Sequence, residues 1–493
     1  MFEAAEVGHR LSKDEWDAQI PELRRKLLEA EYRLVEDPRA AVAVVVAGVD
    51  GAGKGDSINQ LHAWMDTRHL RTHGLGLPTE EERRYPPMWR FWRRLPPRGQ
   101  IGVFMGSWYT APIIDRVFGR TDAAELDRQL DRIRRFERML AHERVVLLKL
   151  WFHLSKEDQE TRLKKLEGSK RTAWRVSKRD WEHFELYDTF KEVSAHALRR
   201  TSIDVAPWVI VPGAEPRYRQ AMVGEALLGA LERASRSPEP ASAPAPIPTP
   251  SALDERTVLS ALDLSQSLSK KKYARSLEEL QGRLNRLTRK KRFRKKHSLV
   301  VVFEGMDASG KGGAIRRVTS ALDARQYVVT PIAAPTDEEQ AQPYLWRFWR
   351  MIPRHGKVAI FDRSWYGRVL VERVEGFASE AAWKRAYAEI NDFEEELVEA
   401  GAVLVKLWLQ IDPEEQLARF RERQAKPFKR YKITDEDWRN RDKWSAYARA
   451  ASEMVERTST EIAPWTLVPA NDKRFARVAV LRAIDDALQA ALE

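Results

Sequence analysis

The stretch that decides the fold is L-V-V-V-F-E-G-M-D-A-S-G-K-G at residues 299–312, which contains the pattern G-x-x-x-x-G-K from Gly305 through Gly310 to Lys311. In such a loop the glycines let backbone N–H groups surround phosphate oxygens. The N-terminus of the following helix adds positive potential, and the lysine reaches the terminal phosphate. Because the loop follows an apolar run and precedes a helical pattern, it predicts a phosphate-binding (Walker A) loop rather than a glycine turn without a ligand.

The same pattern occurs twice in the chain. G-V-D-G-A-G-K-G begins at Gly48, which is 257 residues before Gly305, and W-R-F-W-R begins at Trp89 and again at Trp346 with the same offset. The motifs S-W-Y, K-L-W and A-P-W repeat in this register too. Since two copies are too few for a solenoid, the repeat indicates a duplicated globular domain. The duplication predicts an internal pseudo-dimer, and it leaves open whether the chain also forms a homo-oligomer.

A segment of different composition separates the two copies. Residues 236–251 read R-S-P-E-P-A-S-A-P-A-P-I-P-T-P-S, and alternating Pro, Ala and Ser cannot build a packed core. We therefore expect an N-terminal P-loop kinase-like domain at 1–235, a Pro/Ala-rich linker at 236–257 and a C-terminal domain at 258–493.

Short apolar strands alternate with helices in both copies. Helical patterns at 15–36 and 270–292 precede the strands A-V-A-V-V-V-A-G and L-V-V-V-F-E-G. The later strands are I-G-V-F-M and V-A-I-F-D, then V-V-L-L-K-L-W-F and A-V-L-V-K-L-W-L, and finally W-V-I-V-P and W-T-L-V-P. This alternation predicts an α/β fold class, a three-layer P-loop kinase-like fold with a mostly parallel sheet, duplicated in tandem.

The phosphate loops lack the hydroxyl that usually follows the lysine. Gly55 and Gly312 stand at that position, where Ser or Thr normally helps to hold Mg²⁺. Another oxygen ligand must substitute, and Asp50 and Asp307 lie inside the loops. Magnesium prefers carboxylate and phosphate oxygens, so these aspartates are candidate metal ligands.

The segment V-A-I-F-D-R-S-W-Y-G-R-V-L-V-E-R supplies a second candidate carboxylate. Asp362 ends an apolar strand, and ligands bind beyond the carboxyl ends of parallel strands. Arg363, Arg368 and Arg373 follow closely, a density that suits a chain of phosphates. Surface ion pairs are the alternative interpretation of these arginines.

Two further motifs allow more than one interpretation. K-P-F-K-R-Y-K places Lys426, Lys429, Arg430 and Lys432 between two helical patterns. They predict either a mobile lid over the phosphates or a solvated basic loop. In W-R-F-W-R we expect the aromatic residues to pack the domain and the arginines to face outward, with base stacking as the alternative.

Composition limits the class of protein. The 493 residues include no cysteine, which excludes disulfides, thiolate metal sites and cysteine nucleophiles. No apolar run approaches the length of about 18 residues that spans a bilayer, and no signal pattern is visible. We therefore expect a cytoplasmic protein without a membrane partner.

Much of the formal net charge of +12 lies in one tract. Residues 270–296 hold 13 Lys or Arg and two acids, Glu278 and Glu279. The tract is either a solvated helix face or a site for a polyanion, which could be nucleic acid or a phosphate polymer. No recognised nucleic-acid module accompanies it, so no nucleic-acid partner is expected.

Taken together, these motifs resemble the second family of polyphosphate kinases in its fused, two-domain form. The resemblance is carried by G-M-D-A-S-G-K-G-G, W-R-F-W-R, D-R-S-W-Y-G-R-V-L-V-E-R-V and A-P-W, and it covers nearly the whole chain except the linker. It implies transfer of the terminal phosphate of inorganic polyphosphate to AMP, giving ADP, with Mg²⁺. The alternatives are a polyphosphate kinase acting on ADP or GDP, or a nucleic-acid-binding P-loop NTPase.

The resemblance also assigns roles to residues. The implied catalytic residues are Asp307, Lys311, Asp362, Arg363, Arg368 and Arg373, with Asp307 and Asp362 as metal ligands. The implied phosphate-binding residues are Gly305, Gly310, Lys311, Gly312, Lys429, Arg430 and Lys432.

The first half departs from this pattern. Met105 and Gly106 replace the Asp-Arg pair, Ala111 replaces Arg368, and Thr172 and Ala173 replace two lid cations. Asp50 and Lys54 remain. We therefore predict that the second half catalyses and that the first half does not.

Overall fold

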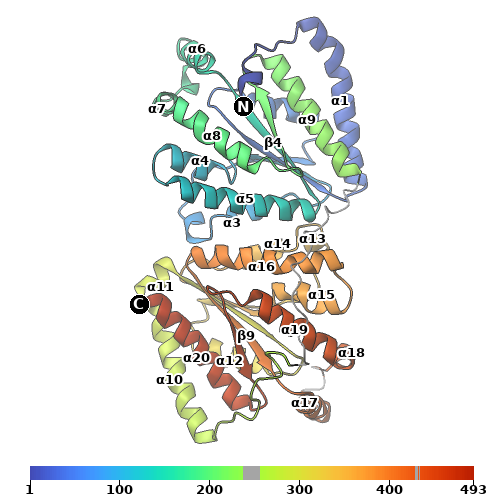
Figure 1. Cartoon of the computed structure of the whole chain (residues 1–493), viewed down its shortest axis with the longest axis vertical. Helices are drawn as coiled ribbons and strands as arrows, with labels where there is room; N and C mark the ends of the chain where they lie inside the picture. The colour runs from blue at the N-terminus through green and yellow to red at the C-terminus, as the bar shows by residue number, and fades with distance from the viewer. Residues whose placement is uncertain (237–255, 428–430, 432) are drawn as a thin grey trace. The chain divides into compact units, whose positions relative to one another are not determined.

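The computed structural model describes residues 1–236, 256–427, 431 and 433–493 (Figure 1). The chain forms two compact units, made of Met1–Pro78, Arg90–Ala241 and Pro335–Trp346 in unit 1 and of Thr79–Trp89, Ser242–Ala334 and Arg347–Glu493 in unit 2. Most of the predicted linker at 236–257 lies outside the described residues, so the predicted domain boundaries stay a prediction. In the described part of the chain, no helix is long and apolar enough to cross a membrane.

Each unit is built on a five-stranded parallel sheet. In unit 1 the strand order is β2-β3-β1-β4-β5, and in unit 2 it is β7-β8-β6-β9-β10 when read in the same direction. The strands of unit 1 are β1(Ala41–Gly48), β2(Leu70–Gly74), β3(Ile101–Met105), β4(Val145–His153) and β5(Trp208–Pro212). Those of unit 2 are β6(Ser298–Gly305), β7(Tyr327–Pro331), β8(Val358–Asp362), β9(Ala402–Gln410) and β10(Trp465–Pro469).

The two sheets share one strand register. Val42 pairs with Ile101 in unit 1, and Leu299 pairs with Val358 in unit 2. Both pairings are related by the offset of 257 residues seen in the motifs. The duplication therefore extends to the residue-by-residue pairing of the strands.

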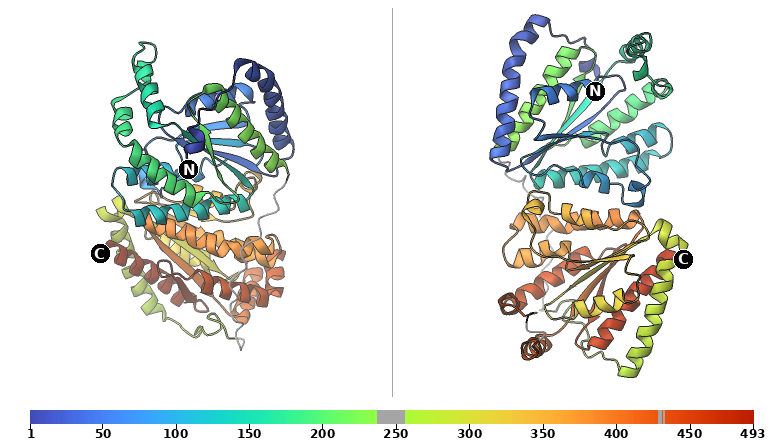
Figure 2. Two further views of the ribbon diagram at one scale, coloured as in Figure 1. Left: turned by 45° about the horizontal axis from the view of Figure 1, so that its top comes forward. Right: turned by 180° about the vertical axis from the view of Figure 1, so that it is seen from behind.

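Helices cover both faces of each sheet, as Figures 1 and 2 show. In unit 1, α1, α2 and α9 pack together, and α9 contacts β4. In the other layer, α5 contacts β4 and α8 packs against α5. The helices up to residue 235 are α1(Lys13–Glu36), α2(Lys54–Trp64), α3(Trp89–Trp92), α4(Thr110–Val117), α5(Ala123–His142), α6(Lys156–Glu167), α7(Lys178–Glu185), α8(Tyr187–Thr201) and α9(Pro216–Ser235).

Unit 2 repeats these layers with α10, α12 and α20 in one layer and α16 and α19 in the other. The helices from residue 270 onward are α10(Lys270–Arg289), α11(Lys291–Lys296), α12(Lys311–Thr319), α13(Asp337–Gln340), α14(Trp346–Met351), α15(Val371–Val374), α16(Glu380–Glu399), α17(Pro413–Ala425), α18(Asp435–Asp442), α19(Trp444–Thr458) and α20(Lys473–Leu492). The α/β fold class and the three-layer arrangement predicted from the sequence are confirmed.

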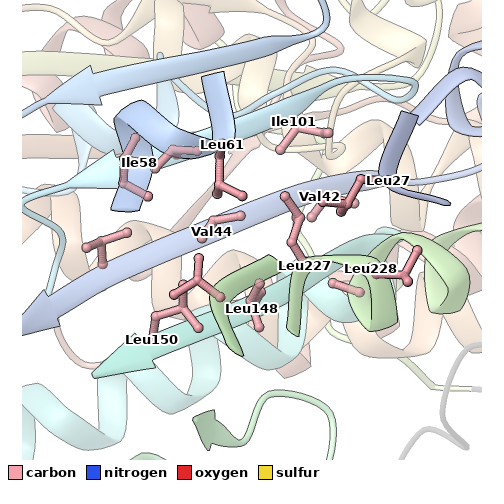
Figure 3. Packing of buried hydrophobic residues seen from close by; sticks show 14 of the residues in the cluster. Leu27, Val42, Val44, Ile58, Leu61, Ile101, Leu148, Leu150, Leu227 and Leu228 are labelled. Carbon is pink, nitrogen blue, oxygen red and sulfur yellow. The ribbon is translucent and has the colours of Figure 1, made fainter. Parts of the chain in front are cut away.

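The core of unit 1 lies between its sheet and the α1–α2–α9 layer (Figure 3). Val42 and Val44 of the central strand are fully buried, and Leu227 of α9 covers them. Full burial on both faces explains why β1 is a continuous apolar run rather than an alternating one.

The repeated motifs S-W-Y and K-L-W meet in a buried ion pair. In unit 2, Lys406 Nζ donates to Glu394 Oε2 at 2.7 Å and to the backbone O of Thr458 at 2.6 Å, and neither charged side chain is more than 1% exposed. Tyr366 Oη donates to Glu394 Oε1 at 2.7 Å. Unit 1 has the same network around Lys149 and Glu137. The network ties β9, α16, α19 and the S-W-Y segment together, so these motifs serve the fold.

The tryptophans of W-R-F-W-R pack as predicted, but two of the arginines do not face outward. Trp92 and Trp349 are buried against Phe136 and Phe393. Arg347 is only 8% exposed because its Nη1 donates to the backbone O of Ala333 at 3.1 Å. Its counterpart in unit 1, Arg90, is equally buried and donates to the O of Gly76. A buried guanidinium is tolerated when carbonyl oxygens satisfy it, and the sequence pattern alone did not reveal those carbonyls.

The basic tract at 270–296 folds as α10 and α11. Leu284 and Phe293 are buried, whereas most of the lysines and arginines are exposed. Both interpretations of the tract, a solvated helix face and a site for a polyanion, stay predictions, because each needs exposed cations.

Candidate active site

The phosphate loop of unit 2 connects β6, the central strand, to α12. Gly305 has φ +142°, and a Cβ there would lie 2.5 Å from the backbone O of Leu409. Gly310 caps α12 in the left-handed conformation, with φ +109°. Both positions require glycine, because a side chain would clash at the first and would be strained at the second. The loop therefore has the predicted strand–loop–helix form and presents the helix N-terminus to a ligand.

Lys311, the first residue of α12, folds back over the loop. Its Nζ donates to the backbone O of Gly305 at 2.7 Å and to that of Met306 at 3.3 Å. Burial, and then the neighbouring charge of Arg363, lower the pKa of Lys311. Lys311 Nζ therefore lies at the loop, where the oxygen of a bound phosphate could accept its hydrogen bonds in place of these carbonyls.

Asp307 and Arg363 form an ion pair that joins the loop to the end of β8. Arg363 Nη2 donates to Asp307 Oδ1 at 2.7 Å, and Asn440 Nδ2 of α18 donates to Asp307 Oδ2 at 2.9 Å. Burial acts to raise the pKa of Asp307, but Arg363, Lys311 and these hydrogen bonds outweigh it and hold the pKa below its ordinary value. Asp307 therefore stays charged.

Asp362 ends β8, beside the central strand, as the sequence predicts. Glu304, which sequence reasoning missed, ends the apolar run of β6. It is 4% exposed, accepts a hydrogen bond from Ser364 Oγ at 2.8 Å, and has its pKa raised by burial. A comparison of the two halves could have found it, because the acidic residue Glu304 in the second half is matched by the apolar Ala47 in the first half.

A cavity of about 440 Å³ opens around the loop and is rich in cations. Its basic lining residues are Lys311, Arg316, Arg363, Arg419, Arg423, Lys473 and Arg477, and its acidic ones are Asp307, Asp362, Glu422 and Asp437. Arg419 is buried and holds the loop, since its Nη1 donates to the backbone O of Ala308 at 2.9 Å and of Ser309 at 3.0 Å. Arg316, Arg419 and Lys473 were missed because they lie outside the motifs.

A smaller cavity of about 60 Å³ adjoins the ion pair. It shares Asp307 and Arg363 with the larger cavity, but Trp408, Trp444 and Tyr447 supply aromatic walls. The site thus consists of a cationic cavity and an aromatic cavity that meet at Asp307 and Arg363.

The other predicted residues are not brought into these cavities. Arg368 pairs with Glu372 at 2.8 Å. Arg373 Nη1 donates to Glu453 Oε2 at 2.6 Å, and its guanidinium stacks 4.0 Å from the centre of the Trp383 ring. Their role in the reaction stays a prediction. Lys429, Arg430 and Lys432 lie outside the described residues, between α17 and α18.

The two carboxylates fit the predicted metal site in part. Asp307 and Asp362 line the same cavity as Lys311. Within the described residues, no group of three or more His, Asp or Glu could hold an ion by itself. Such a pair suits Mg²⁺, which is usually held by one or two carboxylates together with substrate phosphates.

The matched site in unit 1 keeps the loop but changes its surroundings. Lys54 Nζ donates to the backbone O of Gly48 at 2.7 Å and of Val49 at 2.9 Å, as Lys311 does in unit 2. His183 Nδ1 lies 2.9 Å from Asp50 Oδ2, in the place of Asn440. Asp50 also lies 3.5 Å from Lys54 Nζ, and Gly106 stands at the position from which Arg363 binds Asp307 in unit 2.

A parallel sheet with a phosphate loop after its central strand and a carboxylate after the neighbouring strand defines a P-loop kinase-like protein. The family model "Polyphosphate kinase 2 (PPK2)" matches residues 10–239 and 267–493. The chain belongs to the polyphosphate kinase 2 family.

Relatives match the chain over its full length. A "Polyphosphate:AMP phosphotransferase" of Pseudomonas aeruginosa is 55% identical and one of Pseudomonas syringae pv. tomato is 53% identical, each alignment covering 100% of this chain and 99% of the relative. A crystal structure titled "putative polyphosphate kinase 2" from Pseudomonas aeruginosa has a TM-score of 0.90 at 52% identity and covers 100% of this chain and 99% of that one.

Proposed function

We propose that the chain transfers the terminal phosphate of inorganic polyphosphate to AMP, giving ADP, at the site in its second half. The observation that carries the proposal is the meeting of a cationic cavity and an aromatic cavity at Asp307 and Arg363. Membership of the family and the names of the full-length relatives support the same reaction.

The cationic cavity suits the polymer. Seven basic side chains line it against four acidic ones, so it attracts a ligand with many negative charges and no apolar part. The backbone N–H groups at the start of α12 face the same space and add positive potential. The arginines can bind phosphate oxygens in pairs.

The aromatic cavity suits the acceptor. Trp444 and Tyr447 offer flat surfaces on which a base can stack. Because a volume of about 60 Å³ is smaller than a nucleotide, we infer that α18 and α19 move when the acceptor enters. Asn440 of α18 donates a hydrogen bond to Asp307. This movement would therefore change the surroundings of Asp307 at the junction of the two cavities.

The reaction needs positioning and charge neutralisation more than a base. A nucleotide phosphate is already largely dianionic near pH 7, with a second pKa of about 6. It can therefore attack the terminal phosphorus of the polymer once the two are aligned. Lys311 and Arg363 stabilise the charge on the transferring group, while Asp307 fixes the direction of Arg363 through their hydrogen bond.

Asp307 and Asp362 are the residues that would hold Mg²⁺. When bound, the ion would neutralise phosphate charge and help to align the reacting oxygens. Arg368, Arg373 and the lid cations Lys429, Arg430 and Lys432 are proposed to assist in binding the polymer or closing over it, as the family resemblance implies.

The experiment that tests the proposal is an acceptor scan. The protein is incubated with polyphosphate and Mg²⁺ and with AMP, ADP, GMP or GDP in turn, and the products are separated by anion-exchange chromatography. We expect AMP to become ADP, and we expect ATP to be a poor substitute for the polymer. Rapid conversion of ADP to ATP with AMP left untouched would overturn the acceptor assignment.

A further inference from the structure

The aromatic cavity of the second half has a much larger counterpart in the first half. The cavity beside the loop of unit 1 measures about 410 Å³, against about 60 Å³ in unit 2. Most of the lining residues occupy matched positions, 257 residues apart. A volume of 410 Å³ falls within the range of about 300–1,000 Å³ that small-molecule sites occupy.

The enlargement follows from a coordinated loss of polar side chains. Ala47 replaces Glu304 and Gly106 replaces Arg363, so two long charged side chains leave the cavity wall. In unit 2, Glu375 is bound to Lys443 Nζ at 2.7 Å and to Tyr447 Oη at 3.3 Å.

Glu375, Lys443 and Tyr447 form a polar cluster in unit 2. The matched residues of unit 1 are Phe118, Leu186 and Phe190, and all three line the cavity. Phe118 is 41% exposed and lies beside His183, their ring centres 5.8 Å apart. A polar cluster has thus been exchanged as a set for apolar and aromatic walls.

On the phosphate side of the unit 1 loop lies a buried arginine that unit 2 lacks. Arg219 stands where unit 2 has Ala476, which lines the cationic cavity. Arg219 is 1% exposed, and its guanidinium lies so close to Gly53 that a Cβ on this glycine would be 2.3 Å from the guanidinium carbon. Arg219 donates to the backbone O of Gly213 at 2.6 Å and to Ser57 Oγ at 3.1 Å. These hydrogen-bond donors are therefore used within the protein.

The remaining charges of the cavity do not favour a polyanion. Asp50 and Asp180 line it together with Lys54, whose Nζ is held by two backbone carbonyls. With two carboxylates against one lysine and one histidine, the lining attracts phosphate far less than the cationic cavity of unit 2 does. Tyr109, Phe118, Trp151, Tyr187 and Phe190 provide aromatic surface, which binds flat rings.

From these observations we propose that the first half binds a nucleoside, with the base among the aromatic residues and without transfer of phosphate. The ligand class is a purine nucleoside such as adenosine. The site is separate from the one in the proposed function, and it stands or falls independently of that reaction.

Direct binding tests the proposal on the full chain. Radiolabelled adenosine and AMP are titrated by equilibrium dialysis against the wild type, Phe118→Glu, Ile114→Trp and Lys311→Ala. Phe118→Glu restores the residue type found at the matched position 375, and because Phe118 is partly exposed this change is safe for folding. Ile114→Trp fills the cavity by volume. Melting curves confirm that each variant is folded.

We expect saturable adenosine binding that Lys311→Ala retains and that Phe118→Glu and Ile114→Trp each weaken by at least about tenfold, since one places a charge on the apolar wall and the other removes the space. At the site that Phe118→Glu removes, AMP should bind no more tightly than adenosine, and tripolyphosphate should not displace either. Because the acceptor site of the second half also takes a base, the number of adenosine sites is determined from each titration. Absence of adenosine binding, or an equal number of sites in the wild type and in a folded Phe118→Glu, would overturn the proposal. Displacement from that site by tripolyphosphate would do so too, because it would identify a phosphate site.

Discussion

The two phosphate-loop lysines provide a matched test of which half catalyses. Lys54→Ala and Lys311→Ala remove the same group from equivalent positions. Each lysine donates to the first two backbone carbonyls of its loop, the shorter bond being 2.7 Å in both units. The structural cost of the truncation should therefore be similar, and a difference in activity reports the role in the reaction.

The magnitude follows from the surroundings of each lysine. Lys311 lies with Arg363 in the wall of the cationic cavity, and removing one preorganised donor from a transition state costs roughly 10²–10³ in turnover, about 2.7–4 kcal/mol of barrier. In the first half, Gly106 stands where Arg363 accompanies Lys311 in the second half. The loop that contains Lys54 is covered by Arg219, which lies against Gly53. We expect Lys311→Ala to lose at least about a hundredfold and Lys54→Ala to keep most of the activity.

The assay is the initial rate of ADP formation from polyphosphate and AMP at saturating Mg²⁺, measured with thermal unfolding of both variants. Equal melting temperatures would show that the two changes disturb folding to the same extent. If both variants stay folded and lose activity equally, the prediction that the first half is inactive is wrong.

Three further predictions follow from the same contacts. Asp307→Asn and Asp362→Asn should each lower turnover at least about a hundredfold, or about 2.7 kcal/mol; full activity with unchanged Mg²⁺ dependence would refute their role. Arg363→Gly should abolish most activity yet raise the free energy of unfolding by about 1 kcal/mol relative to Arg363→Ala, because glycine relieves a left-handed backbone; equal unfolding curves would count against this. Glu394→Gln should destabilise unit 2 by about 3–5 kcal/mol in chemical denaturation, since it leaves Lys406 buried without its counter-charge, and a loss below about 1 kcal/mol would contradict that reading.

The sequence predicted the parts of the site that are local in the chain. Gly305, Lys311 and Asp362 belong to strand–loop segments whose apolar runs and glycines are visible in a short window, so the fold places them as predicted. Arg419 and Asn440 were not predicted, because each is more than 100 residues away in the sequence from the loop residue that it contacts. Such contacts depend on where α17 and α18 pack, which periodicity does not give.

Two of the four edge strands, β2 and β7, were missed for a different reason. Their residues are only partly buried, with Leu70 the single buried residue of β2 and none in β7. An edge strand of five residues that faces solvent lacks the continuous apolar run that marks the central strands. The basic lid remains a prediction, because Lys429, Arg430 and Lys432 lie outside the described residues.

The backbone itself separates what the fold requires from what the site requires. Gly106 and Arg363 occupy the same position after matched strands, and both have positive φ, +83° and +65°. In an ordinary residue this conformation costs about 1–2 kcal/mol, so the fold alone would favour glycine, as the first half has. The second half carries the strained arginine, and its guanidinium makes the 2.7 Å bond to Asp307 at the junction of the two cavities. Strain of this kind persists where surrounding structure and function maintain it. Here the strained residue is in the second half, where the guanidinium of Arg363 makes a contact that glycine cannot make.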